Sequence, residues 1–436
     1  MTYNNDNHRS SFKLYYALIL LFLIICLSAI SPAALSEEWQ LGGHLKYFLS
    51  QSRYDDDNIF SQAGSSSPTD QTLNFRLTAK NNWATNWDID IHYELSAYHS
   101  ESIEAARNFG PLPTLAGFGI PTDEARLFDL THVFIDEGKN VAFQRLDRLS
   151  IGYTATNYVV RFGRQAVSWG NGMVFQPMDI FNPFSPTAID KEYKSGDDMA
   201  YMQNLFDSGD DLQTVLIPRR DITTGELDTE VSSLAVKYHT IQGDIDIDLL
   251  ASRHFADNLL GVGFSANWQG AVLRADLLNA WNTDGSTLSG IIGINYAWVW
   301  SEHNFIGFIE YYRNGYGIDD GDYSPTALIA RPELTSRVAR GEIFTLGQDY
   351  LTTGLSVELT PRWLFNPLLI NNLNDGSWLT QWIATYDWKH NLNLLLGANL
   401  PFGDKGTEYG GIPATTTPET YIGGGQSVFL QLAYYF

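Results

Sequence analysis

The chain ends with the stretch Val428-Phe429-Leu430-Gln431-Leu432-Ala433-Tyr434-Tyr435-Phe436. Successive side chains of an extended strand point to opposite faces, so Val428, Leu430, Leu432, Tyr434 and Phe436 share one face. That face is entirely apolar and ends on an aromatic carboxyl-terminal residue. The same alternation recurs along the chain, as in 86–98, where apolar and hydrophilic residues strictly take turns. The pattern predicts an all-β protein whose strands each carry one apolar and one hydrophilic face.

Composition excludes several classes of partner and chemistry. The formal net charge is −23, which argues against nucleic acid or an anionic membrane surface as a partner. The single cysteine, Cys26, excludes an internal disulfide or a thiolate metal site. The 12 tryptophans and 23 tyrosines are a rich supply of the amphipathic rings found at membrane interfaces.

The amino-terminal segment has the organisation of a secretory signal. Basic residues precede an apolar run over 14–30, and small residues follow at Ser31, Ala33, Ala34 and Ser36. We predict that residues 1–36 are a cleaved signal peptide and that 37–436 form the mature protein. An uncleaved anchor is the alternative, although the apolar run is short for a membrane span.

With a secretory signal at one end, the aromatic terminal strand resembles the assembly signal of bacterial outer-membrane β-barrels, carried by Tyr434 and Phe436. This resemblance implies residence in the bacterial outer membrane. The partners it implies are outer-membrane lipid, lipopolysaccharide and the barrel-assembly machinery. We expect a monomer, because no segment marks an oligomer face.

Counting alternating segments predicts a transmembrane antiparallel up-and-down β-barrel of about 18 strands, with 16 possible. A soluble secreted β-protein would also alternate, but its strands are typically shorter. The predicted strands are 39–50, 71–83, 86–98, 125–136, 141–153, 157–165, 212–218, 230–240, 244–254, 259–268, 270–280, 289–300, 304–314, 348–359, 362–371, 377–388, 391–401 and 427–436.

One connection, 166–211, is far longer than the other links on its side of this predicted barrel, where turns should be short and periplasmic. It is rich in glycine and proline but also in aromatic residues, so we expect a folded loop rather than a disordered one. We predict an inward-folded insert that narrows or plugs the lumen. A periplasmic subdomain or a partner-docking surface is the alternative.

The start of this insert carries a motif. Gly163-Arg164-Gln165 followed by Trp169-Gly170 resembles the Gly-Arg-Gln-x-x-x-aromatic-Gly signature of alginate-export-like and related porin-like outer-membrane proteins. The resemblance implies a monomeric barrel with inward loops that passes polar or anionic solutes by diffusion. A polyuronate conduit needs a strongly basic lumen, whereas the predicted inward positions here are of mixed charge, so no substrate carries over.

Charged and aromatic residues around the insert are the candidate pore-lining or constriction residues. We expect Arg164 to pair with Asp179, Asp197 or Asp198 and so to pin the insert to the wall, because a guanidinium grips a carboxylate bidentately. Pore lining is the alternative role for Arg164 and the expected one for Arg161. The full candidate set is Arg161, Arg164, Trp169, Asp179, Asp190, Lys191, Asp197 and Asp198.

These features favour a porin-like channel that passes polar or charged small solutes, or an exported product, by diffusion. An inner-membrane or periplasmic exporter is then a possible partner. The alternatives are a sealed barrel acting as an adhesin or assembly scaffold, and a transporter of hydrophobic compounds or lipids. We expect no enzyme, cofactor or metal site, because no nucleophile elbow or metal-ligand spacing occurs.

Overall fold

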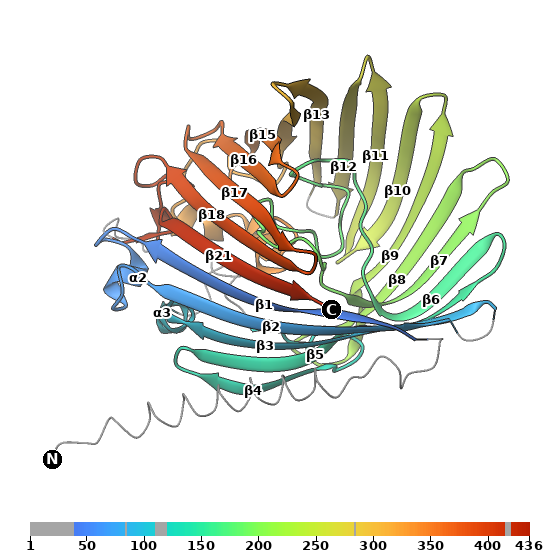
Figure 1. Ribbon diagram of the computed structural model, residues 1–436, viewed down its shortest axis with the longest axis horizontal. Helices are drawn as coiled ribbons and strands as arrows, with labels where there is room; N and C mark the ends of the chain where they lie inside the picture. The colour runs from blue at the N-terminus through green and yellow to red at the C-terminus, as the bar shows by residue number, and fades with distance from the viewer. Residues whose placement is uncertain (1–38, 83–84, 110–119, 283–284, 415–419) are drawn as a thin grey trace.

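The protein is a β-barrel with an internal crossing segment (Figure 1). The computed structural model describes residues 39–436 except 83–84, 110–119, 283–284 and 415–419. The predicted signal peptide, 1–36, lies outside the described residues. In the part that is described, no helix is long and apolar enough to cross a membrane.

Eighteen antiparallel strands close the barrel, and β21 pairs with β1 to complete the ring. The predicted architecture is therefore confirmed, including the number of strands. The barrel strands are β1 (Trp39–Arg53), β2 (Thr69–Asn81), β3 (Trp87–Ser100), β5 (Asn140–Thr154), β6 (Tyr158–Gln165), β7 (Asp197–Leu205), β8 (Asp211–Arg220), β9 (Leu227–Gln242), β10 (Ile245–His254), β11 (Asp257–Trp268), β12 (Ala271–Trp281), β13 (Ser286–Trp300), β14 (His303–Arg313), β15 (Asp349–Thr360), β16 (Trp363–Asn372), β17 (Trp378–Lys389), β18 (Leu392–Phe402) and β21 (Gln426–Tyr435).

The alternation in sequence sorts residues between the two sides of this wall. Leu260, Ile292 and Trp382 are at least half exposed on the outside, whereas Asp276 and Thr352 are fully buried on the inside. A bilayer solvates the outer apolar side chains, and the closed ring leaves no backbone hydrogen-bonding edge in the hydrocarbon. The barrel is therefore built to span a membrane.

Two predictions about individual strands were wrong, and because one adds a strand and the other omits one, the predicted number of 18 is still correct. The strand predicted at 125–136 corresponds to β4 (Thr131–Glu137), which pairs only with the loop-end half of β5 and is not one of the 18. The strand β7 has no counterpart among the predicted strands, because its residues fall within the predicted insert, 166–211. Consequently the insert is shorter, 166–196, and it leaves the end of the barrel opposite the two termini.

We call the end that carries the short turns and the termini the turn end, and the other end the loop end. The predicted position of the insert at the turn end was thus wrong. Counting β4 as a spanning strand reverses the predicted direction of each strand that follows it, up to the insert. The insert is therefore predicted at the turn end although it leaves the barrel at the loop end.

The loops at the loop end pack into a small unit that we call the cap. It contains α2 (Ile59–Gln62), α3 (Glu101–Phe109), α4 (Pro325–Ile329), α5 (Pro332–Ala339) and the short pair β19 (Ile412–Pro413) and β20 (Tyr421–Ile422). Its apolar centre draws on loops far apart in sequence and comprises Ile59, Phe60, Ala105, Ile318, Tyr323, Leu334, Leu346, Ile412 and Ile422. This burial gives the cap a hydrophobic core of its own above the barrel.

The chain terminus lies at the β1 seam. The Phe436 and Gly43 backbones exchange two hydrogen bonds, and the Phe436 ring stacks on Phe75 with centroids 6.1 Å apart. Tyr434 faces outward beside it and is 41% exposed. Both side chains are thus displayed on the outer wall at the turn end, and their recognition by assembly machinery stays a prediction.

Candidate functional site

The insert, residues 166–196, crosses the interior of the barrel (Figure 1). Its side chains and backbone bond to the inner face of strands all around the ring. The Trp169 indole donates to Gln213 on β8 at 2.9 Å, and Gln381 on β17 donates to the Thr187 carbonyl at 2.8 Å. The prediction of an inward-folded insert is confirmed.

The first part of the insert is fastened to an acidic stretch of wall. Backbone N–H groups of Met173, Val174 and Phe175 all donate to the Glu310 carboxylate on β14, at 2.5, 3.1 and 2.9 Å. The backbone and amide of Asn171 donate to Asp276 on β12, at 2.7 and 2.8 Å. Lys191 and Lys237 attract Glu310 and Asp276 only at longer range, so the converging N–H groups are the direct partners that make these buried carboxylates tolerable.

A tight turn makes this convergence possible. A Cβ placed on Gly172 would come within 1.8 Å of the Phe175 carbonyl oxygen, so only glycine fits. The sequence Gly170-Asn171-Gly172 therefore shapes the backbone that wraps Glu310.

The last part of the insert is fastened to a basic stretch of wall. The Lys46 ammonium on β1 contacts Asp190 at 2.6 Å and Glu192 at 2.5 Å. The Tyr193 ring lies against the Arg76 guanidinium of β2, 4.3 Å from its centroid. Cationic side chains of the wall thus meet carboxylates and an aromatic face supplied by the insert.

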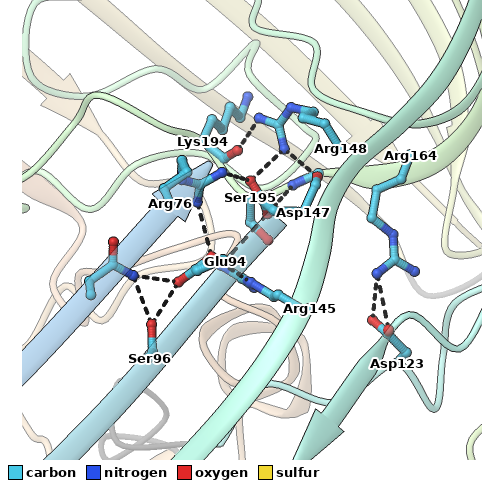
Figure 2. A network of polar contacts seen from close by, with 12 residues as sticks. Arg76, Glu94, Ser96, Asp123, Arg145, Asp147, Arg148, Arg164, Lys194 and Ser195 are labelled. Atoms are coloured by element: carbon cyan, nitrogen blue, oxygen red, sulfur yellow. Dashed lines mark hydrogen bonds and ion pairs between the residues drawn. The ribbon is translucent and has the colours of Figure 1, made fainter. Parts of the chain in front are cut away.

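Behind these contacts lies a buried ionic cluster on β2, β3 and β5 (Figure 2). Arg76 bridges Glu94 at 2.9 Å and Asp147 at 2.8 Å, while Arg145 and Arg148 pair with the same two carboxylates. Three guanidiniums share two carboxylates, so the cluster keeps an excess of positive charge. Arg148 also donates to the Lys194 carbonyl, which ties the end of the insert to the cluster.

The acidic and basic stretches face each other. In the ring of 18 strands, β12 to β14 stand nine places from β2 to β5, which is half of the circumference. The insert runs between them and exposes Asp190, Lys191 and Glu192 in the lumen. The lumen is therefore polarised, with a charge-bearing segment crossing it.

Several predicted site residues serve the internal structure of the insert. Asp179 pairs with Lys194 at 2.6 Å and not with Arg164, and both partners are buried. Trp169 is buried in an apolar cluster with Met178, Phe181 and wall residues of β7 to β12. These contacts fold the insert on itself. Asp190 and Lys191 are the predicted residues that the structure leaves exposed in the lumen.

Arg161 lies on the inner face of β6 and pairs with Asp88 at 2.7 Å. Its neighbours Val160 and Phe162 are 40% and 48% exposed on the outside, as alternation requires. The inward direction predicted for Arg161 agrees with this arrangement, and its part in a pore stays a prediction.

Arg164 lies on the opposite side of the wall from the position that pore lining requires. It follows Val160 and Phe162 in outward register, and its partner in the ladder is Asp198. Arg164 contacts Asp198 at 2.8 Å and Asp123 at 3.0 Å and donates to the Phe128 carbonyl at 2.7 Å. Figure 2 shows Arg164 with Asp123, apart from the ionic cluster.

Residues 120–130 therefore cover Arg164 from outside, and we call them the flap. Although burial opposes ionisation of Asp123, Arg126 and Arg164 lower the pKa of this carboxyl. The pairing with Asp198 was among those predicted, but what Arg164 holds is the flap and not the insert. Asp197 instead pairs with Arg219 of β8 at 2.8 Å.

Sequence reasoning missed Lys46, Glu310 and Arg148, which hold the two parts of the insert. All three sit at inward positions of predicted strands, so alternation marked them only as polar. A single lysine at position 46, within an otherwise uncharged strand, was the one usable signal. Their partners lie more than 100 residues away or, for Arg148, 46 residues away, and no local pattern reports such pairing.

Comparison with known proteins places this geometry in a fold. No family model and no curated protein sequence matches the chain. Solved structures do match. They include Pseudomonas aeruginosa OccK5 (OpdH), with a TM-score of 0.55 and 9% identity over 92% of this chain and 98% of that one. Pseudomonas aeruginosa OpdQ matches with a TM-score of 0.53 and 8% identity over 92% of this chain and 99% of that one. A BenF-like porin from Pseudomonas fluorescens Pf-5 matches with a TM-score of 0.50 and 10% identity over 92% of this chain and 99% of that one.

The chain has a porin fold. The similarity extends over nearly the whole described barrel and supports a porin-like outer-membrane protein. It does not extend to the alginate-export-like family suggested by Gly163-Arg164-Gln165. A closed barrel with an apolar outer face is the form in which proteins cross the bacterial outer membrane, and we assign the chain to that membrane.

The cap of this porin-fold protein contains a proton-sensitive contact. Glu408 accepts hydrogen bonds from the Leu346 amide at 2.7 Å, from the Asn372 amide at 2.7 Å and from the Tyr350 hydroxyl. It therefore joins loop 403–411 to loop 314–348 and to the barrel rim. Burial raises the pKa of the Glu408 carboxyl to about 7, with the neighbouring Asp375 carboxylate adding to the effect.

We expect this contact to weaken as pH rises. The pKa is higher in the folded state than the ordinary 4.5, so stability is fully present below about 4.5 and is lost as pH passes 7. The difference corresponds to about 3 kcal/mol of local stability. Hydrogen exchange of residues 403–411, corrected for the intrinsic rate, should accelerate between pH 5 and 8. In Glu408→Gln this extra acceleration should vanish; an unchanged profile would contradict the assignment.

Proposed function

We propose that the protein is an outer-membrane channel whose constriction is formed by the insert, and that small polar or charged solutes diffuse past it. The observation that carries this proposal is the polarised lumen. Acidic residues of β10 to β14 and basic residues of β1 to β5 stand on opposite sides of the crossing insert. A transverse field of this kind orients and sorts charged solutes in a narrow aqueous passage.

We do not propose alginate as the solute. A polyanion requires free cations along its path, but Arg76, Arg145, Arg148 and Arg161 are each already paired with a carboxylate. Lys46 is paired with two carboxylates, those of Asp190 and Glu192. The arginines of this wall therefore keep only a small excess of positive charge and none of them is free to follow a long chain, which favours small solutes over a polyuronate.

The test is single-channel recording of the refolded mature protein in a planar bilayer. Stable, reproducible conductance steps are expected, with a reversal potential under a salt gradient that reports the selectivity. A barrel that is inserted and heat-modifiable yet electrically silent would overturn the channel. It would favour the sealed adhesin or scaffold, in which insert and cap together close the lumen.

A substitution at Lys46 should change the selectivity in a defined direction. In Lys46→Gln the exposed carboxylates of Asp190 and Glu192 lose their counter-charge, so the preference for potassium over chloride should rise by roughly a factor of two. Reversal potentials in a potassium chloride gradient measure this ratio.

The matched control is Lys80→Gln on the neighbouring strand β2. Lys80 is more than half exposed and its carboxylate partner, Asp90, is 3.7 Å away on the wall, not on the insert. The charge change is the same, so an equal shift in both variants would mean that the insert carboxylates do not set selectivity.

A further inference from the structure

A cavity lies between the insert, the barrel wall and the cap, on the loop-end side of the crossing segment. It has a volume of about 90 Å³, and residues 342–345 of the cap are part of its lining. Its walls come from the insert over 174–186, from the loop-end halves of β10 to β14 and from loop 314–348. A solute that enters from the loop end meets this cavity before the charged segment at 190–192.

The apolar part of the cavity is aromatic and rigid. The Phe175 ring stacks on Tyr312 with centroids 4.3 Å apart, and this pair fixes one wall. Phe184 and Phe344 add two further rings, and Phe344 is 41% exposed. Prolines of the insert, including Pro177 and Pro183, hold the backbone between these rings. Phe175 and Tyr312 are buried against each other, so Phe184 and Phe344 are the rings that can stack on the flat face of another ring.

The charged side chains that line the cavity are already paired. Asp257 contacts Arg337, which also binds Glu333 at 2.5 Å. Glu342 binds Arg340 at 2.7 Å, and Asp179 binds Lys194 at 2.6 Å. An ion entering the cavity would lose hydration without gaining a free counter-charge, which is unfavourable.

One polar group at the cavity retains hydrogen-bonding capacity. The Gln176 side chain is exposed, and its amide nitrogen makes a single long contact, 3.4 Å to the Gly172 carbonyl. A primary amide can donate two hydrogen bonds and accept two. Gln176 can therefore bind a neutral hydroxyl or carbonyl group of a molecule in the cavity.

We propose that this cavity is a binding site for a small uncharged solute that combines one flat ring with a hydrogen-bonding group. The enclosed volume is smaller than the roughly 150 Å³ cavity that admits benzene, so the ring is only partly enclosed and its polar end remains at Gln176. The proposal extends the channel function by naming a solute class, and it relies on that function only for passage through the barrel.

Binding of three matched probes to the refolded protein in detergent tests the proposal by isothermal titration calorimetry. Benzyl alcohol is neutral, benzoate is anionic and benzylammonium is cationic, while the ring is the same in all three. Benzyl alcohol should bind at least about tenfold more tightly than either ion. Equal affinities, or tighter binding of an ion, would overturn the proposal.

Two variants separate the cavity from partition into the micelle. Phe344→Ala removes an exposed wall ring and should weaken benzyl alcohol binding by about fivefold, whereas Phe344→Trp should retain it. Phe134→Ala removes an equally exposed ring, 43% against 41%, from β4 outside the cavity and should have no effect. Equal losses in the two alanine variants would refute the site.

This measurement needs no conductance. Probe binding by an electrically silent barrel would leave the site standing and reject only the channel. A conducting barrel that does not bind benzyl alcohol would reject only the site.

Discussion

Replacement of residues 166–196 by an Asn-Gly turn should raise single-channel conductance at least about threefold, because an 18-stranded barrel without its crossing segment encloses a wide aqueous lumen. The structure permits the replacement, since Gln165 and Asp197 are direct partners in the β6–β7 ladder. A two-residue turn can join such partners without disturbing the strands. Planar-bilayer recording before and after replacement measures the change.

A matched control shortens another connection at the same end. Arg220 and Leu227 are also ladder partners, and residues 222–226 between them are exposed to solvent. The same Asn-Gly turn in place of 221–226 should leave conductance unchanged. An insert deletion that folds and conducts like the wild type would contradict the constriction.

A milder variant keeps the prediction testable if the deletion does not assemble. Glu310→Gln removes the charge on which three backbone N–H groups of the insert converge. Loosened insert contacts should then appear as frequent transitions to a higher conductance level. A variant without such transitions would show that Glu310 does not hold the constriction.

Arg164→Ala should destabilise the protein by about 3–5 kcal/mol, because it leaves Asp123 and Asp198 buried without their shared cation. The flap should detach from the outer wall, which exposes the peptide bond after Arg126 to trypsin. Limited proteolysis and a lowered urea midpoint measure the two effects. Conductance should stay the same, since Arg164 lies on the outward side of the wall.

Arg220→Ala is the control for this substitution. Arg220 also reaches the flap, through a 3.4 Å contact to the Leu127 carbonyl, but it shares no carboxylate with Arg164. Cleavage after Arg126 should stay slow in this variant. If Arg164→Ala raised conductance without exposing Arg126, the sequence-based expectation that Arg164 pins the insert would be restored.

The alternation of residues determined the fold class. The polarity of each strand face shows whether that face lies against lipid or in the lumen, because a side chain in lipid must be apolar whatever its neighbours are. For this reason the stretch 428–436 and the segment 86–98 predicted barrel strands without knowledge of their partners. The glycine, proline and aromatic content of the insert likewise marked a folded, inward segment, because composition limits regular structure locally.

Only the tertiary structure decided where the insert leaves the barrel and what holds it. The end of the barrel at which the insert leaves depends on whether the number of spanning strands before it is odd or even. One loop strand, β4, has the same alternating pattern as a spanning strand and so changes this count. A second error, in which β7 resembled a continuation of the insert after Gln165, restored the direction of the strands that follow.

The sequence also could not predict which charged side chains pair with each other. Arg164 sits next to the insert in the chain, yet its carboxylates are on β7 and the flap, and the outward register of β6 decides this. Glu310 and Lys46 hold the insert from strands far away in the sequence. A carboxylate or an ammonium is compatible with many partners, and the closure of the ring alone determines which of them lies within hydrogen-bonding distance.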